Sequence, residues 1–151
     1  MKNDSKALFA PFLVGLLALS ALEAPAAVAP HSKESMMEEA THVVRGKVVA
    51  LSSQTQKSKV ERGLLIARDR IFKITVKVTT WEKGKGVKEG DALTLEAWQP
   101  STRFPRIPGP QGHQPIPVKG DLLKAYLVYD KESKTYHPFM PNGIEVLKKV
   151  K

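Results

Sequence analysis

Cysteine is absent from this chain of 151 residues. Its absence excludes disulfide bonds, a thiol nucleophile and thiolate metal ligands. The chain also lacks a G-x-S-x-G nucleophile elbow, an H-E-x-x-H zinc motif and a Walker-type phosphate loop. We therefore expect no enzyme activity and no bound cofactor. Stability must come from packing rather than from covalent cross-links.

Long apolar stretches are also scarce, and the main one lies at the N-terminus. Residues 7–22 are mostly apolar, Lys2 and Lys6 precede them, and small residues follow up to Ala29. This stretch is shorter than the roughly 20 residues that span a bilayer. A positive start, an apolar middle and a small-residue end predict a signal peptide over residues 1–26. We expect export to the periplasm or the extracellular space, with no transmembrane span after processing; a retained anchor is the alternative.

Acidic residues are fewer than basic ones. The chain has 24 Lys and Arg residues against 15 Asp and Glu residues, which gives a formal net charge of +9. A basic exported protein tends to meet anionic surfaces such as lipid headgroups or acidic polysaccharides. The alternative is that the charge serves solubility alone. Nucleic acid is an unexpected partner for an exported chain.

Alternating residues predict a mostly β domain. From Phe72 to Val78, apolar residues alternate with Lys and Thr, as expected for strands with one wet face. Residues 27–41 precede the domain and include a predicted helix over 32–41, capped by Ser32 or Ser35. The predicted strands of the domain, which covers residues 42–148, are 43–51, 64–81, 92–98, 122–130, 135–140 and 144–147.

Three connections are informative. Residues 52–63 are polar and rich in lysine, which predicts a mobile loop or a long hairpin tip. Residues 99–119 contain six prolines, which predict a long irregular loop because proline lacks an N–H and restricts φ. Residues 141–143, Pro-Asn-Gly, predict a tight turn that pairs the last two strands with each other.

The strand count favours a five- to six-stranded antiparallel OB-like barrel preceded by one short helix. Gly46 in the first strand predicts the bulge or bend that such a barrel needs. A β-sandwich is the alternative architecture.

Three segments resemble exported bacterial domains related to the netrin and metalloproteinase-inhibitor OB-fold group. They are THVVRGKVVAL, IFKITVKVTTWEKGKGVKEGDALTLEAW and GDLLKAYLVYD. The resemblance covers about residues 41–147 and implies an OB fold. The animal relatives inhibit through a metal-chelating N-terminal cysteine, so the resemblance does not imply that activity for this cysteine-free chain.

A candidate binding surface begins at the end of the third predicted strand. Trp98, Arg103, Phe104 and Arg106 combine aromatic and cationic side chains within nine residues. Such a combination suits an anionic ligand or a protein partner. The alternative is a loop that packs back onto the domain, with the aromatic residues covering its end.

A candidate metal site combines His113, His137 and Met140, because imidazole and thioether groups are ligands for copper or zinc. No short histidine spacing supports this set, and buried structural histidines are the alternative. The sequence therefore predicts a non-enzymatic binding module for an unknown protein or anionic ligand. A periplasmic copper- or zinc-binding protein is the second hypothesis.

Overall fold

The computed structural model describes residues 28–106, 108, 109 and 111–150. The predicted signal peptide, residues 1–26, lies outside the described residues. Among those described, no helix is long and apolar enough to cross a bilayer. The elements are α1 (Lys33–Glu39), β1 (His42–Lys57), β2 (Ile66–Lys83), β3 (Ala92–Phe104), β4 (Leu122–Asp130), β5 (Thr135–Pro138) and β6 (Ile144–Lys148).

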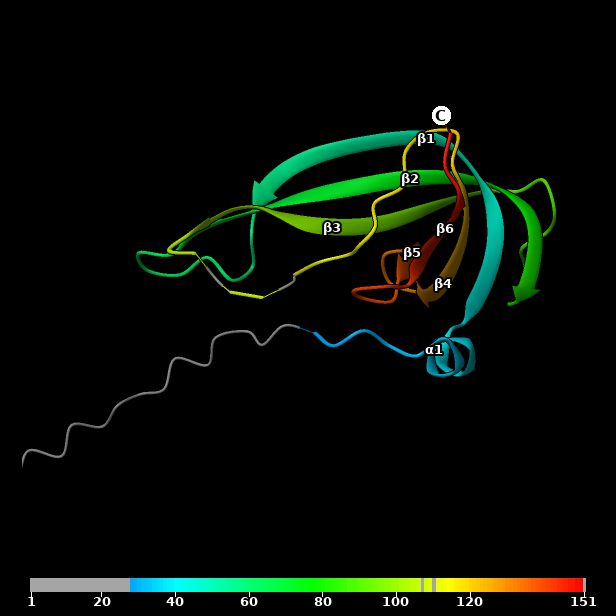
Figure 1. The fold of residues 1–151 in the computed structure, drawn as a ribbon, viewed down its shortest axis with the longest axis horizontal. Helices are drawn as coiled ribbons and strands as arrows, with labels where there is room; N and C mark the ends of the chain where they lie inside the picture. The colour runs from blue at the N-terminus through cyan, green and yellow to red at the C-terminus, as the bar shows by residue number, and fades with distance from the viewer. Residues whose placement is uncertain (1–27, 107, 110, 151) are drawn as a thin grey trace, which may run out of the picture.

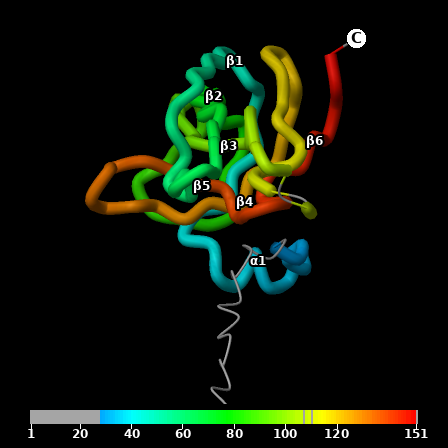
Figure 2. Tube along the Cα trace, turned by 90° about the vertical axis from the view of Figure 1, so that its left-hand side faces the viewer, coloured from blue at the N-terminus to red at the C-terminus, as the bar shows by residue number. Residues whose placement is uncertain are grey.

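The single described helix is short and depends on its surroundings. The Ser32 hydroxyl caps its start by accepting a hydrogen bond from the Ser35 N–H at 3.1 Å. At its other end the Lys83 ammonium group donates to the carbonyls of Met37 and Glu38, at 2.9 and 2.7 Å. Figures 1 and 2 show α1 beside the start of β1. It packs there through a small apolar cluster of Met36, Ala40, Val43 and Tyr126.

The strands form one six-stranded sheet in the order β1-β2-β3-β5-β4-β6, and β1 also pairs with β4. The mostly β class with one short helix is thus confirmed. The expected wholly antiparallel arrangement is wrong at one place, because β3 and β5 pair in parallel through Leu95 and Tyr136. β2 and β4 are both antiparallel to β1, while β3 is antiparallel to β2 and β5 is antiparallel to β4. β3 and β5 therefore both run in the direction of β1.

The main hydrophobic core lies on the face of the sheet that the alternating pattern indicated. Ile74, Val76 and Val78 are buried, while Lys73 and Lys77 are exposed. The other buried members of this core are Phe72 of the same strand and residues of other segments: Val44, Val48, Val87, Leu93, Leu95, Ala97, Leu123, Ala125, Leu127 and Ile144. Strands β1 to β4 and β6 thus share one interior.

Parts of two segments that were predicted to be irregular are strands, and residues 52–63 belong to a long hairpin rather than to a mobile loop. Residues 52–57 continue β1, and each pairs with a residue of β2. Residues 99–104, at the start of the proline-rich segment, continue β3. Pro100 is accommodated at a register shift in the β2–β3 pairing, where a missing N–H costs little. Cross-strand pairing with β2 therefore overrides the polar and proline-rich local composition.

The predicted pairing of the last two strands is also wrong. β5 and β6 both pair antiparallel with β4, β5 toward its end and β6 at its start. Between them the chain loops out, and Gly143 donates to the Phe139 carbonyl at 2.7 Å. Tyr126 of β4 spans the gap because its carbonyl accepts from Phe139 and its N–H donates to Gly143. The turn thus separates two segments of one sheet edge instead of reversing the chain.

Gly46 lies where the predicted irregularity occurs. The β1–β2 register shifts between Arg45 and Gly46, which confirms the expected bulge. A Cβ atom added at Gly46 would overlap the Lys77 carbonyl oxygen and lie 2.5 Å from Val76 Cγ1. The backbones of β1 and β2 therefore approach each other here more closely than any other residue type allows.

We expect Gly46→Ala to reduce the free energy of unfolding by about 1–3 kcal/mol, because the added methyl group must displace packed neighbours. Urea denaturation followed by circular dichroism measures the change. Lys47→Ala, at an exposed position of the same strand, is the control. Equal stability of the two variants would contradict the close approach.

Candidate functional site

The first three strands extend past the main core as a three-stranded arm, on the left in Figure 1. We use the term arm for residues 52–57 of β1, 66–71 of β2 and 98–104 of β3. All six residues of the β1 segment are exposed, whereas Ala67 of the β2 segment is fully buried, so the arm is covered only in part. The predicted binding residues Trp98, Arg103 and Phe104 lie on the arm, and Arg106 directly follows it.

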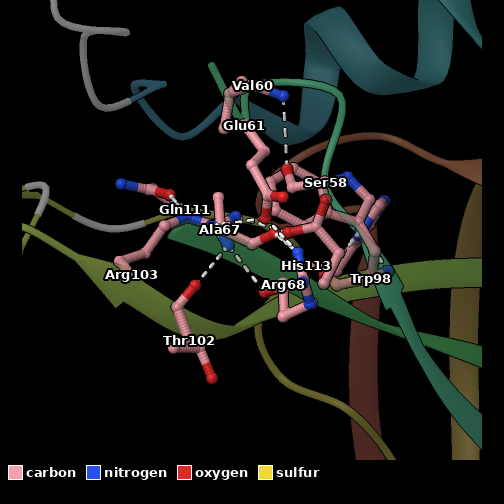
Figure 3. A network of polar contacts seen from close by, with 11 residues as sticks. Ser58, Val60, Glu61, Ala67, Arg68, Trp98, Thr102, Arg103, Gln111 and His113 are labelled. Carbon is pink, nitrogen blue, oxygen red and sulfur yellow. Dashed lines mark hydrogen bonds and ion pairs between the residues drawn. The ribbon is translucent and has the colours of Figure 1, made fainter. Parts of the chain in front are cut away.

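Arg103 faces into the protein. Its side chain is only 7% exposed and forms an ion pair with Asp69, which is 15% exposed. The guanidinium group also donates to Gln111 Oε1 at 3.2 Å and to the Arg68 carbonyl at 2.6 Å (Figure 3). Its donors are therefore directed to groups of the same chain. Arg103 joins two strands of the arm to the proline-rich loop.

Glu61 organises the connection between β1 and β2. Its carboxylate accepts a hydrogen bond from the Ala67 N–H at 2.9 Å and forms an ion pair with Arg68 (Figure 3). The Lys57 ammonium group lies 3.3 Å from the other carboxylate oxygen. The Ala67 N–H, helped by the two cations, holds the pKa of Glu61 below its ordinary value. This connection is thus tied to the arm by a charged carboxylate.

Trp98 is half-buried, and its backbone contacts His113 of the proline-rich loop. The Trp98 N–H donates to His113 Nδ1 at 3.1 Å, and the His113 N–H donates to the Trp98 carbonyl at 2.8 Å. Gly112 allows this approach because it has a φ of +75° and an added Cβ would lie 2.5 Å from the Trp98 oxygen. The loop thus covers the outer edge of β3. This agrees with the alternative prediction that the loop packs back onto the domain.

His113 is buried, and both of its ring nitrogens contact backbone groups. Its Nε2–H donates to the Pro138 carbonyl at 3.1 Å, which leaves Nδ1 to accept from Trp98. Burial lowers the pKa of His113, and the nearby His137 adds to this effect, although the two backbone contacts act against it. Both ring nitrogens therefore have partners within the chain.

The other residues of the candidate metal set are arranged differently. His137 Nε2 lies 2.7 Å from the Thr135 hydroxyl. Met140 is half-buried in the turn after β5. Among the described residues, no group of three or more His, Asp or Glu side chains is placed to hold a metal ion. The described part of the chain therefore contains no carboxylate or further histidine that would complete such a site.

Apolar side chains are exposed at the far end of the arm. Phe104 is 68% exposed, and its partner across the strands, Ile66, is 50% exposed. Leu64, in the connection before β2, is 94% exposed. Directly opposed residues of neighbouring strands point to the same face, so Phe104 and Ile66 form one apolar surface. None of the three belongs to either hydrophobic cluster of the fold.

Cations surround these apolar residues. Residues 57–70 and 103–106 contain seven Lys and Arg residues and only two carboxylates, which leaves five of the nine net positive charges of the chain in this region. Both carboxylates are already paired with Lys57, Arg68 and Arg103. Four exposed cations have no ion pair within the described residues: Lys59, Arg62, Arg70 and Arg106. Arg70 pairs with Gln99 near the base of the arm. We call the other three, with Leu64, Ile66 and Phe104, the arm tip.

Sequence reasoning identified Phe104 and Arg106 but missed the rest of the arm tip. The polar composition of residues 52–63 predicts a loop or a hairpin tip and no binding surface, although two leucines, Leu64 and Leu65, stand directly after a run rich in lysine and arginine. That apolar pair beside free cations was the available signal. Their proximity to Phe104 depends on the β2–β3 register, which local patterns do not specify.

Two shallow depressions lie elsewhere, on either side of Lys47. One has a volume of about 610 Å³ and includes Lys148 and Lys149. The other has a volume of about 410 Å³ and includes Lys77. The C-terminal segment is held there by the Val150 N–H, which donates to the buried carboxylate of Asp121 at 3.0 Å. The arm tip itself lines neither depression.

The Arg103–Asp69 ion pair predicts a strong dependence of stability on both partners. We expect Arg103→Ala or Asp69→Ala to reduce the free energy of unfolding by about 2–4 kcal/mol, because either change leaves a largely buried charge without its partner. The double variant should lose less than the sum of the two. Urea denaturation provides the measurement, and Arg106→Ala, an exposed cation, should change stability by less than about 0.5 kcal/mol. Additive single effects would contradict the coupling.

His113 predicts a pH dependence of stability. Its pKa in the folded chain lies below the ordinary 6.5, so the unfolded chain binds a proton at a higher pH than the folded chain does. The stability due to the neutral ring is complete above pH 6.5 and falls as the pH drops below that value toward the lowered pKa. Denaturation at a series of pH values should show this loss, and His113→Gln should remove it. His31→Gln is the control, and an unchanged profile in His113→Gln would refute the assignment.

Comparison with known proteins adds no further constraint on the site. No protein-family model, no curated protein and no solved structure matches this chain. The resemblance to the netrin and metalloproteinase-inhibitor group therefore stays a prediction from the quoted sequence segments. The function of the chain must be inferred from its own residues and their arrangement.

Proposed function

We propose that this chain is an exported, non-enzymatic binding module with an OB-like barrel, and that its arm tip binds an anionic partner. The single observation that carries the binding function is the arm tip, where exposed apolar side chains stand among cations that form no ion pair with any residue the structure describes. Export is supported by the N-terminal pattern of residues 1–26.

Strand pairing supports the barrel. β1 pairs with β2 on one side and with β4 on the other, and β3 reaches β4 through β5. This order returns to its starting strand, as a closed five-stranded arrangement requires. Side chains of β1, β2, β3 and β4 fill the shared interior, and the partly buried Tyr136 of β5 packs against it. The bulge at Gly46 gives β1 the curvature that pairing on both sides demands.

The distribution of charge supports an anionic partner. Internal ion pairs use the carboxylates of Glu61 and Asp69, so the exposed charged groups that remain in this region are cationic. Opposite charge on a partner attracts it and directs its approach. Binding to a prearranged surface also costs less conformational entropy, and the Arg103 and Glu61 networks hold the arm in one arrangement.

The metal-binding hypothesis lacks a comparable observation. His113 uses both ring nitrogens for backbone contacts, and a metal ion would have to replace one of them. Metal binding therefore remains a prediction from the sequence. Metal analysis of the purified protein, compared with that of His137→Ala, is the measurement that addresses it.

Retention on immobilised heparin tests the proposed function. We expect Lys59→Ala/Arg62→Ala/Arg106→Ala to elute at clearly lower salt than the unchanged protein, because each lost cation removes an attraction that salt screens. Lys88→Ala/Lys119→Ala/Lys131→Ala removes the same charge from exposed positions outside the arm. Equal elution of the two triple variants would show that net charge alone determines retention, and would refute a site at the arm tip.

A further inference from the structure

We infer that the partner of the arm tip is an anionic phospholipid bilayer, into whose surface Leu64, Ile66 and Phe104 insert. This inference rests on the proposed function and specifies its ligand. It adds to the charge argument the shape and apolar character of the arm tip.

The apolar residues lie where insertion needs them. Ile66 begins β2, Phe104 ends β3, and Leu64 stands in the connection ahead of Ile66. All three therefore lie at the end of the arm that is farthest from the main core. Leu64, at 94% exposed, is the most exposed of the large hydrophobic residues of the described chain. A projecting end that carries leucine, isoleucine and phenylalanine can enter the headgroup and acyl boundary of a bilayer without moving the rest of the fold.

The cations fit the same orientation. Lys59 and Arg62 lie in the connection that holds Leu64, and Arg106 lies two residues after Phe104. Lysine and arginine near a negatively charged membrane each contribute a favourable interaction, and their long apolar stems tolerate the boundary region. Apolar insertion and headgroup contact would therefore occur together.

A folded protein partner fits these observations less well. A stable protein interface takes about 20–30 residues from each side and a well-packed apolar centre. The arm tip has six residues, far fewer than one side of such an interface. A bilayer needs neither a pocket nor a large area, because its affinity increases with each inserted apolar group and each cation.

Co-sedimentation with vesicles tests the inference. The processed chain from Ala27 is used because residues 7–22 are themselves mostly apolar, and α1, all six strands and both hydrophobic clusters of the described residues lie after residue 27. We expect binding to vesicles that contain one-third phosphatidylglycerol and little binding to vesicles of phosphatidylcholine alone. Binding to the anionic vesicles should weaken about tenfold or more in L64S/I66S/F104S. The control changes three exposed aliphatic residues outside the arm tip and should bind like the unchanged protein: V49S/V128S/L147S.

The outcomes separate the inference from the proposed function. Retention on heparin without binding to anionic vesicles would leave the arm tip an anion-binding surface and would overturn the bilayer, in favour of an acidic polymer or protein. Equal vesicle binding by L64S/I66S/F104S and the unchanged protein would overturn insertion. If the unchanged protein bound neither heparin nor anionic vesicles, both proposals would be refuted.

Phe104→Trp provides a second measurement that does not depend on removing apolar groups. Brominated lipids quench indole fluorescence only where the ring reaches the acyl region. We expect more quenching in this variant than in the unchanged protein, whose Trp81 and Trp98 provide the baseline. Equal quenching would contradict insertion of the arm tip.

Discussion

The pairing of β1 on both of its edges is the constraint on which the rest of the structure depends. Residues 43–47 pair with β2 on one side and β4 on the other, and this part of β1 contributes Val44 to the main core. Beyond Val48, which exchanges hydrogen bonds with Gly120 and Asp121, pairing with β2 continues while pairing with β4 has ended. The same strand therefore belongs to the core in its first part and to the arm in its last.

An arm without a core beneath it needs polar interactions to hold its shape. In the arm β2 pairs with both β1 and β3, but residues 52–57 are exposed on both faces. The Arg103–Asp69 pair, the Glu61 carboxylate and the His113 ring take over, each linking a strand to a neighbouring segment. These groups use the carboxylates of the region internally. The charge left at the surface is consequently positive, and the exposed apolar residues at the end belong to neither hydrophobic cluster of the described chain.

The strands with regular alternation were predictable because burial of one face selects that pattern directly. Residues 72–78 and 122–130 are examples, and the short helix before them followed from its serine cap. Residues 52–57 and 99–104 were not predictable, because their strand structure comes from pairing with β2 and not from their own composition. Arg103 illustrates the same limit at the candidate site: its position in the sequence suggested a surface cation, but Asp69, 34 residues earlier, places it inside.

The sequence by itself determined the elements that bury an apolar face, the excess of positive charge and the lack of any thiol chemistry, because each is a property of residues close together in the chain or of the composition. Only the tertiary structure decided which cations remain unpaired within the described residues, which histidine nitrogens have partners, and that Leu64 and Ile66 join Phe104 at one end of the molecule. These features depend on the register between strands distant in sequence. A shift of one residue in that register would move every side chain of the shifted strand to the opposite face of the sheet.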